Sequence, residues 1–468
     1  MYISRHLVYG RHELTWDVVI AMMHSTKNST VCAVILAFSM QVPSAIAEQQ
    51  IGYGPNPQLP KPEGSLIPTI KVADAKGWAQ GAKPTAAVNL SVSEFAGDLN
   101  HPRWMHVLPN GDVLVAETNG PERPEDDKGI KAWFMNYFMS KAGAGVKSAN
   151  RITLLRSSEN DGPATKHVFL EGLNSPFGMA LVGDTLYVAN ADALVKFPYR
   201  QGDLKITAAA EKVADLPGGA RNHHWTKNVI ASKDGKKLFV TVGSNSNVAE
   251  NGMAEEENRA AILEIDPATG ATRVFASGLR NPNGMAFEPS TGELWTVVNE
   301  RDEIGNNLVP DYLTSVKDGG FYGWPYSYFG QNVDTRVEPP RPDLVAKAIM
   351  PDYALGAHTA SLGLTFGPAS TLPPNFASGA FIGQHGSWNR KPVSGYKVIF
   401  VPFANGKPNG EPQDVLSGFL DAEGNALGRP VGVEIAKDGA LLVADDVGNK
   451  IWRVTGSGNT SSLPSPKL

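Results

Sequence analysis

The sequence predicts an all-β fold, a six-bladed β-propeller with loop insertions, because one phrase recurs along the chain. Each clear copy holds a Pro, a short β-type run, a tight turn with Gly or Asp, and a second apolar run. Four clear copies begin at His101, Asn174, Arg280 and Gly428, and two weaker copies begin at His224 and His358. The 48 Gly and 34 Pro of the chain also favour many turns over long helices.

The six copies give one blade each, and loop insertions make their spacing irregular. Further strand signals follow the copies, as expected of blades that contain more than two strands. The run "AAVNLSVSEFAG", residues 86–97, is predicted to complete the last blade and close the ring. We therefore place the propeller at 88–457, between an arm at 48–87 that is rich in Pro, Gly and Lys and a flexible tail at 458–468.

One insertion, residues 121–150, interrupts the first blade. Its run "IKAWFMNYFMSK" predicts a short helix. The aromatic face of this helix either docks on the scaffold or forms a lid or substrate wall, and the sequence leaves both interpretations open.

The composition is that of a soluble globular protein with a sizeable core: 468 residues, 42% hydrophobic, 19% charged, net charge −5. Nothing in it indicates nucleic-acid binding or disorder. Lys27 precedes an apolar run at 31–40, and Ala45 and Ala47 follow at small-x-small positions. These are the three parts of a secretory signal over 1–47, and ten apolar residues are too few to span a bilayer.

The only cysteine, Cys32, lies inside this signal, so the exported chain has no thiol. This excludes disulfides, iron–sulfur clusters, Cys-ligated zinc and covalently attached c-type haem. We expect a periplasmic or secreted protein with no stable membrane insertion and no nucleic-acid partner.

The candidate functional residues stand just before strands, where the loops of several blades meet at one mouth of a propeller. The chain has no nucleophile elbow, zinc-protease helix, P-loop or EF-hand loop. His223 and His224 come directly before an inner strand, where one of them acts as a base or both are hydrogen-bonded core histidines. Arg280 and Asn281 take the same point of the next blade, and the arginine either neutralises an anion or forms a salt bridge between loops.

The loop "NERDEIGNN", residues 299–307, concentrates carboxylates and amides. Such hard oxygen ligands suit Ca²⁺, although a solvated charged loop is the alternative. Further cationic or proton-active groups fall at equivalent loop positions of later blades: His358, Arg390, Lys391 and Arg429. Their convergence on one mouth indicates an anionic cofactor or substrate.

The phrases "RNPNGMAF", "NERDEIGNN" and "DGGFYGWP", after "NHHWTKNVI", resemble the pyrroloquinoline quinone (PQQ)-dependent glucose/sorbosone dehydrogenase family. The resemblance spans about 88–454 and is nearer to the L-sorbosone dehydrogenase branch than to the soluble glucose dehydrogenases. It implies a secreted six-bladed propeller that uses PQQ and Ca²⁺ to oxidise aldose sugars or sugar aldehydes. A separate acceptor, a cytochrome or a quinone, would then take the electrons.

The resemblance also implies roles for single residues. His223 is similar to the catalytic base and Arg280 to the arginine that faces the quinone carbonyl, with Asn281 beside it. The implied ligands of the PQQ carboxylates are Arg429 and either Arg390 or Lys391. The implied substrate wall is Asn174, His224, Trp324 and His358. The implied calcium ligands are the backbone carbonyls near Glu300 and Arg301, where the Gly-Pro of the family is absent, and Asp302, Glu303 and Tyr322 at additional structural sites.

Two rival functions remain. A calcium-dependent propeller hydrolase of the lactonase type would use the same loop carboxylates without a quinone, and it should lack the cations Arg280, Lys391 and Arg429. A non-catalytic propeller that binds extracellular polymers or protein partners would not depend on His223.

Overall fold

The computed structural model describes residues 51–63, 71–121, 141, 143, 145–158 and 162–458. The described residues belong to one unit, which begins at Gln49. The expected signal over 1–47, most of the insertion at 121–150 with its expected helix, and the tail after 458 lie outside the described residues. Within the described ranges, no helix is both long and apolar enough to cross a membrane.

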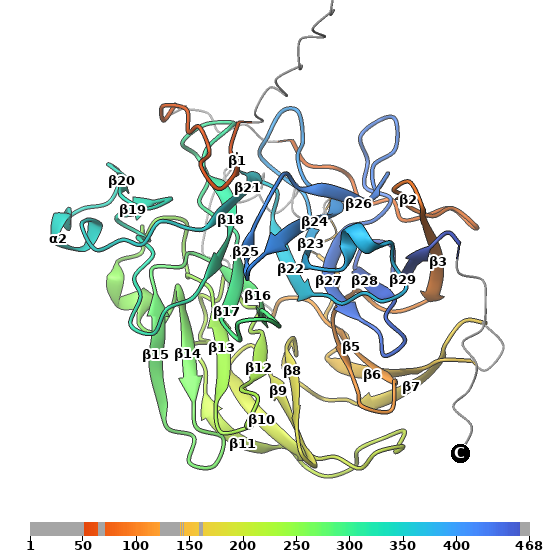
Figure 1. Ribbon diagram of the computed structural model, residues 1–468. Coiled ribbons are helices and arrows are strands. Elements are labelled where there is room, and N and C mark those ends of the chain that lie inside the picture. The colour runs from red at the N-terminus through yellow and green to blue at the C-terminus, as the bar shows by residue number, and fades with distance from the viewer. Residues whose placement is uncertain are drawn as a thin grey trace, which may run out of the picture. The chain divides into compact units, whose positions relative to one another are not determined.

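Six antiparallel sheets form the blades of a propeller, which confirms the predicted fold and blade number (Figure 1). From the inner strand outwards, blade one is β4 (Pro102–Val107), β5 (Val113–Glu117), β6 (Arg151–Arg156) and β7 (Thr165–Leu170). Blade two is β8 (Met179–Val182), β9 (Thr185–Ala189), β10 (Ala193–Pro198) and β11 (Glu211–Asp215). Blade three is β12 (Val229–Ala231), β13 (Leu238–Val242), β14 (Ala261–Ile265) and β15 (Thr272–Ser277).

The other three blades each recruit a strand from the N-terminal side of the chain. Blade four is β16 (Pro282–Phe287), β17 (Leu294–Val298), β18 (Pro310–Ser315), β21 (Tyr353–Ala357) and β1 (Tyr53–Gly54). Blade five is β22 (Ser361–Phe366), β23 (Gly379–Gln384), β24 (Lys397–Ala404), β26 (Gln413–Ser417) and β2 (Thr85–Ala86), and β25 (Lys407–Pro408) pairs with β24. Blade six is β27 (Pro430–Ile435), β28 (Leu441–Asp445), β29 (Lys450–Gly456) and β3 (Leu90–Ala96).

The ring closes as the run at 86–97 predicts, because β3 pairs with β29 and places Val92 opposite Val454. Each inner strand contacts the inner strands of the two neighbouring blades, so the chain circles a common axis. A small hairpin of β19 (Ser327–Tyr328) and β20 (Asn332–Val333), with the short helix α2 (Pro342–Val345), is inserted between β18 and β21. Two 3₁₀ turns span Met253–Glu256 and Pro374–Phe376.

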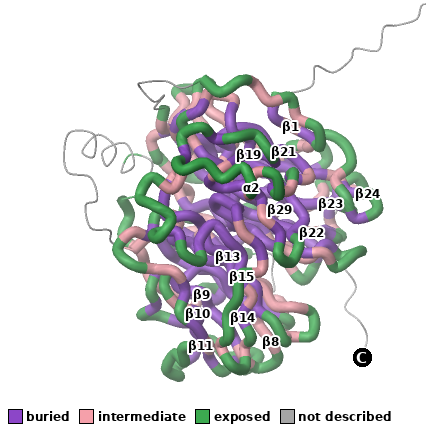
Figure 2. Tube along the Cα trace, turned by 90° about the vertical axis from the view of Figure 1, so that its left-hand side faces the viewer, coloured by how far each residue is buried: buried purple, intermediate pink, exposed green. Residues whose placement is uncertain are grey.

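The core lies between neighbouring blades and is built from their inner and middle strands (Figure 2). The second strands β5, β13, β17 and β28 are buried along their whole length. Leu442 and Ala444 of β28, for example, pack with Met105, Val113 and Val115 of blade one. Burial on both faces explains why the second half of each repeat is a nearly unbroken apolar run.

One half-buried carboxyl group, Glu434, gives a pH-dependent stability among the inner strands. Glu434 of β27 accepts the Ile435 amide at 3.1 Å, and Thr365 of β22 lies 3.5 Å away. Burial raises the pKa of Glu434 to about 7, although these hydrogen bonds oppose the shift. A raised pKa means that the folded chain holds the proton more tightly, so this contribution to stability is complete below the unfolded pKa of about 4.3 and is lost as the pH rises through 7.

Glu434→Gln should therefore be more stable than the wild-type chain at pH 8.5 and no more stable at pH 4. Since the glutamine stays neutral, we expect its Tm at pH 8.5 to be higher by roughly 2 °C. Thermal unfolding followed by circular dichroism at the two pH values measures the difference. A variant whose Tm follows that of the wild type at both pH values would contradict this assignment.

Candidate active site at the mouth of the ring

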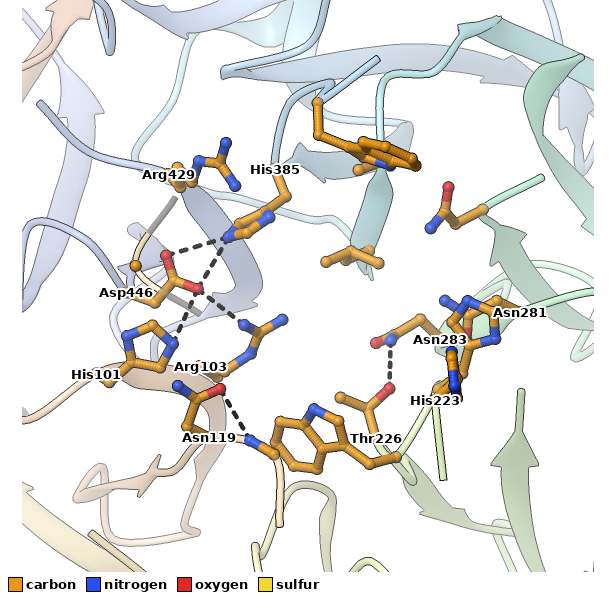
Figure 3. A pocket seen from close by; sticks show the side chains of 18 of the residues that line it. His101, Arg103, Asn119, His223, Thr226, Asn281, Asn283, His385, Arg429 and Asp446 are labelled. Atoms are coloured by element: carbon orange, nitrogen blue, oxygen red, sulfur yellow. Dashed lines mark hydrogen bonds and ion pairs between the residues drawn. The ribbon is translucent and has the colours of Figure 1, made fainter. Parts of the chain in front are cut away.

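One end of the propeller axis opens into a cavity of about 470 Å³. The second strand of each blade runs antiparallel to the inner strand, so the residues before inner strands and after second strands meet at the same end. The cavity-lining side chains used below come from five blades: His101, Arg103, Asn119, His223, His224, Thr226, Asn281, Asn283, Asn299, His385, Trp388, Arg429 and Asp446 (Figure 3).

A buried carboxylate organises one wall of the cavity. Asp446 Oδ2 accepts Arg103 Nη1–H at 2.9 Å and His385 Nε2–H at 2.9 Å, and His101 Nε2 lies 3.5 Å away (Figure 3). Burial opposes ionisation, but His385, His101 and Arg103 hold the pKa of Asp446 well below its usual range. Burial lowers the pKa of His385 to about 4, so near neutral pH its ring is an uncharged donor to an ionised Asp446.

Two arginines on the same wall each have an Nε–H group with no hydrogen-bond partner among the described residues. These are Arg103 and Arg429, and both Nε atoms are buried. Arg429 Nη2 donates to the Tyr396 hydroxyl at 2.7 Å, and its guanidinium carbon lies 5.0 Å from the centre of that ring. An unsatisfied guanidinium N–H is costly in a buried site, so this wall is suited to a bound anionic oxygen.

The opposite wall presents neutral amides (Figure 3). Asn283 Nδ2 donates to Thr226 Oγ1 at 2.9 Å, while the Oδ1 atoms of Asn281 and Asn283 have no partner among the described residues. Gly243 allows this wall to form, because a Cβ there would collide with Asn281 Oδ1 and His224 Cβ. The cavity thus has arginine side chains on one side and neutral amide side chains on the other.

The two adjacent histidines of blade three differ in how their rings are held. His224 Nδ1 lies 2.7 Å from the Ser244 carbonyl and 3.1 Å from the Ser244 hydroxyl oxygen. A carbonyl oxygen only accepts, so the neutral ring carries its proton on Nδ1 and leaves the lone pair on Nε2. His223 is exposed, and its backbone amide lies 3.4 Å from Asn245 Oδ1.

A buried lysine supports the loop that carries both histidines. Lys227 Nζ donates to the His224 carbonyl at 3.3 Å, the Trp225 carbonyl at 3.1 Å and Asn222 Oδ1 at 3.4 Å. Its side chain is fully buried, and that burial lowers its pKa well below the usual range. Lys227 therefore connects the backbone of this loop to the segment that leads into β12.

Arg280 turns away from the cavity and toward the loop at 299–302. Its Nη1 donates to the Glu300 carbonyl at 2.8 Å, and its Nη2 donates to Asn247 Oδ1 at 2.9 Å and lies 3.5 Å from Asp302 Oδ2. This is the salt bridge between loops, one of the two interpretations that the sequence leaves open for Arg280. Its neighbour Asn281 is the residue of this pair that lines the cavity.

The acidic side chains of the loop at 299–307, of which Asp302 and Glu303 are predicted calcium ligands, have protein partners or are exposed. The other predicted ligands are the backbone carbonyls near Glu300 and Arg301, and the Glu300 carbonyl accepts Arg280 Nη1–H at 2.8 Å. Glu300 Oε2 accepts the backbone amide and the Nε–H of Arg301, both at 3.0 Å. Arg301 is itself fully buried and forms a second ion pair with Asp334 at 3.1 Å. Asp302 Oδ1 binds His358 Nδ1 at 3.0 Å and Asn389 Nδ2 at 2.9 Å.

The remaining members of the predicted calcium set do not complete a site. The Glu303 side chain is exposed, and the Tyr322 hydroxyl donates to the Ser315 carbonyl at 2.7 Å. Among the described residues, no group of three or more His, Cys, Asp or Glu is arranged to hold a metal ion. The side chains of Asp302, Glu303 and Tyr322 therefore do not form a metal site in this arrangement, and the predicted backbone-carbonyl ligands near Glu300 and Arg301 stay a prediction.

Five more predicted residues lie outside the cavity lining. Trp324 Nε1 donates to the Asn247 carbonyl at 3.0 Å, and His358 Nε2 donates to the Gly305 carbonyl at 3.0 Å. Arg390 and the backbone of Lys391 bind the loop at 306–307, and Asn174 is exposed. Of all the predicted site residues, the structure brings four together around the cavity: His223, His224, Asn281 and Arg429.

The sequence reasoning missed the wall around Asp446 and part of the amide wall. The missed residues are His101, Arg103, Asn119, Thr226, Asn283, Asn299, His385, Trp388 and Asp446. Equivalent positions in the repeat could have identified several of them. His101 and Arg103 flank the Pro of the copy that begins at His101, just as Asn281 and Asn283 flank the Pro of the copy that begins at Arg280.

Comparison with known proteins places the chain in a family. The sequence model of the TrAA12-like family matches residues 84–314 and 344–457. A protein of unassigned function from Borreliella burgdorferi is 29% identical over 292 residues, covering 60% of this chain and 76% of its own length. A pyrroloquinoline quinone-dependent pyranose dehydrogenase from Coprinopsis cinerea is 27% identical over 307 residues, covering 53% of this chain and 42% of its own length.

Solved structures share the fold at low sequence identity. The holo form of the Coprinopsis cinerea pyranose dehydrogenase PQQ domain matches with a TM-score of 0.63 and 20% identity, covering 82% of this chain and 100% of that domain. A Trichoderma reesei structure of carbohydrate-active enzyme family AA12 matches with a TM-score of 0.64 and 18% identity, covering 84% of this chain and 100% of its own. Since the family match spans most of the propeller, the chain belongs to the TrAA12-like family.

Proposed function

We propose that this protein is a PQQ-dependent oxidoreductase that oxidises aldose sugars or sugar aldehydes. The observation that carries the proposal is the cavity at the ring mouth. Arg103 and Arg429 line it, each with a buried Nε–H that has no partner among the described residues, opposite the amides of Asn281 and Asn283. The name of the Coprinopsis cinerea relative, a PQQ-dependent pyranose dehydrogenase, supports the same chemistry. The cationic wall also argues against the lactonase-type alternative, which needs no such wall.

The described residues fit PQQ, a flat quinone that carries three carboxylates. Arg103 and Arg429 would hold its carboxylates through charge-assisted hydrogen bonds, and Asn281 and Asn283 would face its other side. When bound, the quinone supplies a two-electron oxidant for the C–H bond of the sugar. The protein contributes binding, orientation and the removal of the hydroxyl proton.

The proton acceptor in this proposal is a neutral histidine of blade three. The sequence prediction was His223, whereas the geometry favours His224, because the Ser244 carbonyl fixes its Nδ1–H and leaves Nε2 as an acceptor. The sugar hydroxyl would give its proton to Nε2 while the C–H bond loses its hydride. His385, hydrogen-bonded to Asp446, lines the cationic wall and would act in binding.

The substrate class, acceptor and location complete the proposal. The substrate would be a neutral aldose or a sugar aldehyde of the L-sorbosone type, and a separate cytochrome or quinone would take the electrons, since no thiol or haem-attachment motif follows Cys32. The signal-like segment at 1–47 supports export to the periplasm or the medium.

In this proposal Ca²⁺ binds only together with PQQ. The unpaired Oδ1 atoms of Asn281 and Asn283 are hard oxygen donors of the kind that Ca²⁺ prefers. Beside a bound carboxylate and quinone they would help to hold the cation, which would act as a Lewis acid. The neutral amides alone carry no charge to bind Ca²⁺ tightly.

Ca²⁺ is therefore expected to raise the Tm of the protein only when PQQ is present. In the cofactor-free chain the loop carboxylates Glu300 and Asp302 already have partners, so neither EDTA nor millimolar Ca²⁺ should shift the Tm measurably. Thermal melts with and without PQQ, each with EDTA or Ca²⁺, make the comparison. Stabilisation of the cofactor-free chain by Ca²⁺, lost in Asp302→Asn, would instead support a metal site in the loop.

The proposed function is tested by the absorbance spectrum of the protein with PQQ. The cofactor-free protein is incubated with PQQ and Ca²⁺, freed of unbound PQQ, and then mixed with candidate aldoses or L-sorbosone. We expect the bound quinone spectrum to change to that of its reduced form on addition of sugar, and to return when an electron acceptor is added. Failure to retain PQQ, or a spectrum that no sugar changes, would contradict the proposal.

A further inference from the structure

A stretch of the N-terminal arm, residues 71–83, reaches the loops that carry the cavity residues. It lies before the region matched by the TrAA12-like family, which begins at 84. The Lys71 amide donates to the carbonyl of the cavity residue Trp388 at 2.9 Å. The Lys76 amide donates to the Ala426 carbonyl at 2.8 Å, close to the start of blade six. The stretch is thus bound to blades five and six at their cavity ends.

The most specific contact of this stretch is the side chain of Trp78. Its Nε1–H donates to Asp445 Oδ2 at 2.7 Å, next to the Nε1–H of Trp452, which donates to the same oxygen at 2.9 Å. Asp445 Oδ1 in turn accepts the backbone amides of Arg429 and Gly448, both at 2.8 Å. A single buried carboxylate therefore links the arm to the backbone of the cavity residue Arg429.

Two glycines leave the space for this contact. A Cβ on Gly428 would collide with Asp445 and with Nε1 of Trp78, and a Cβ on Gly448 would collide with Asp445 and with Cδ1 of Trp78. The indole also packs edge-on against Phe419 at 5.6 Å and Trp452 at 5.4 Å between ring centroids. Blade six is thus shaped on several sides to receive an indole from the arm.

We propose that Trp78 is a positioning residue for cofactor binding, which acts through Asp445 to fix Arg429. The inference rests on the proposed function, because it concerns how the cationic wall is held ready for PQQ. Among the residues that the structure describes, the Arg429 side chain has one hydrogen-bond partner, the Tyr396 hydroxyl, and its backbone amide donates to Asp445. Loss of the Trp78 N–H bond would loosen that carboxylate and with it the place of the guanidinium.

The protonation of Asp445 gives this role a measurable signature. Burial raises the pKa of Asp445 to about 6, while hydrogen bonds from Trp452, Trp78 and the Gly448 and Arg429 amides oppose the rise. Lys450 pairs with Asp445 across strands β28 and β29, and Arg429 donates its backbone amide to it. The neighbouring Asp446 is engaged by His101, Arg103 and His385. The four N–H donors together occupy two acceptor positions on each oxygen, so protonation displaces at least one of them, and removal of the Trp78 donor raises the pKa of Asp445 further.

The test is PQQ binding to the cofactor-free chain, measured by calorimetry or by quenching of tryptophan fluorescence in Ca²⁺-containing buffer from pH 5 to 8. Trp78→Phe keeps an aromatic ring and removes the N–H, and Trp78→3-benzothienylalanine also keeps the two-ring shape. We expect the Kd for PQQ at pH 7.5 to rise about tenfold in both, as for a lost bond to a charged group. The pH at which affinity falls to half should move upward.

Lys76→Ala is the matched control, since it removes the exposed ion pair of the arm with Asp421 at 3.0 Å and leaves Asp445 untouched. It should bind PQQ as the wild type does at every pH. The proposal is overturned if both Trp78 variants keep the wild-type Kd and pH midpoint, or if Lys76→Ala loses as much affinity as they do. A wild-type chain that does not bind PQQ would overturn the proposed function itself, a result distinct from either of these.

Discussion

Replacing His224 by Gln is expected to slow the reduction of bound PQQ by sugar by on the order of 10² to 10⁴, the usual contribution of a positioned base. The glutamine side chain fills similar space and can still donate to the Ser244 carbonyl, so the fold and the PQQ affinity should persist. It cannot accept a proton at the position of Nε2. The measurement is the single-turnover rate of PQQ reduction in protein reconstituted with PQQ and Ca²⁺.

His223→Gln is the internal control, because the two histidines are adjacent and both line the cavity. The His223 ring is exposed, and its replacement should act mainly on KM. If His223→Gln abolishes the step and His224→Gln leaves it intact, the assignment made from sequence spacing holds and the geometric argument fails. If neither variant slows the step, the histidine-base mechanism fails as a whole, and another group must accept the hydroxyl proton.

The fold could be predicted from the sequence because the apolar pattern that forms a blade is repeated six times. Every blade buries its second strand on both faces, so each repeat must contain an unbroken apolar run after a turn. Closure of the ring by β3 could be predicted as well, since the strand-like run at 86–97 precedes the first copy and belongs to none of the six. The pairing of β1 and β2 with blades four and five could not, because each is two residues long and lacks periodicity.

Site residues could be predicted only where their position in the repeat determines whether they reach the cavity. His223, His224, Asn281 and Arg429 precede inner strands, and the topology alone carries such residues to the ring mouth. Arg280 precedes an inner strand as well, but its long side chain reaches the Glu300 carbonyl instead of the cavity. Sequence position fixes where a backbone lies, and it does not fix where a flexible side chain ends.

The loop at 299–307 shows a second limit of sequence analysis, which is that an acidic motif does not reveal what its side chains bind. The loop "NERDEIGNN" is rich in carboxylates, but it also holds Arg301, which is fully buried and neutralises Glu300 and Asp334. His358 and Asn389, distant in sequence, occupy Asp302. Whether an acidic loop binds a cation or an arginine depends on tertiary partners that a local motif does not reveal. The Asp446 wall was missed for the matching reason, since its members come from blades one, five and six.

Arg429→Ala is expected to weaken PQQ binding by about 1 to 3 kcal/mol, or roughly 5- to 150-fold in Kd. The substitution removes a buried guanidinium whose Nε has no partner among the described residues, and with it a charge-assisted hydrogen bond to a cofactor carboxylate. Because the loss lies in binding and not in the chemical step, excess PQQ should restore turnover. The measurement is the Kd of the cofactor-free protein for PQQ, together with the rate at limiting and at saturating PQQ.

Arg390→Ala separates the structure-based assignment from the sequence-based one. Either Arg390 or Lys391 is predicted to share the PQQ carboxylates with Arg429. Arg390, however, lies outside the cavity lining, where its Nε donates to the Asn306 carbonyl at 3.0 Å and its Nη2 to Asn307 Oδ1 at 2.8 Å. Its removal should leave the Kd for PQQ unchanged within about twofold, since no contact of this side chain faces the cofactor site. A large loss of affinity in Arg390→Ala, with none in Arg429→Ala, would indicate that the cofactor binds near the loop at 306–307 and not at the wall around Asp446. Equal losses in both variants would mean that PQQ binding closes the loop onto the cavity, and Arg429 alone would no longer account for the affinity.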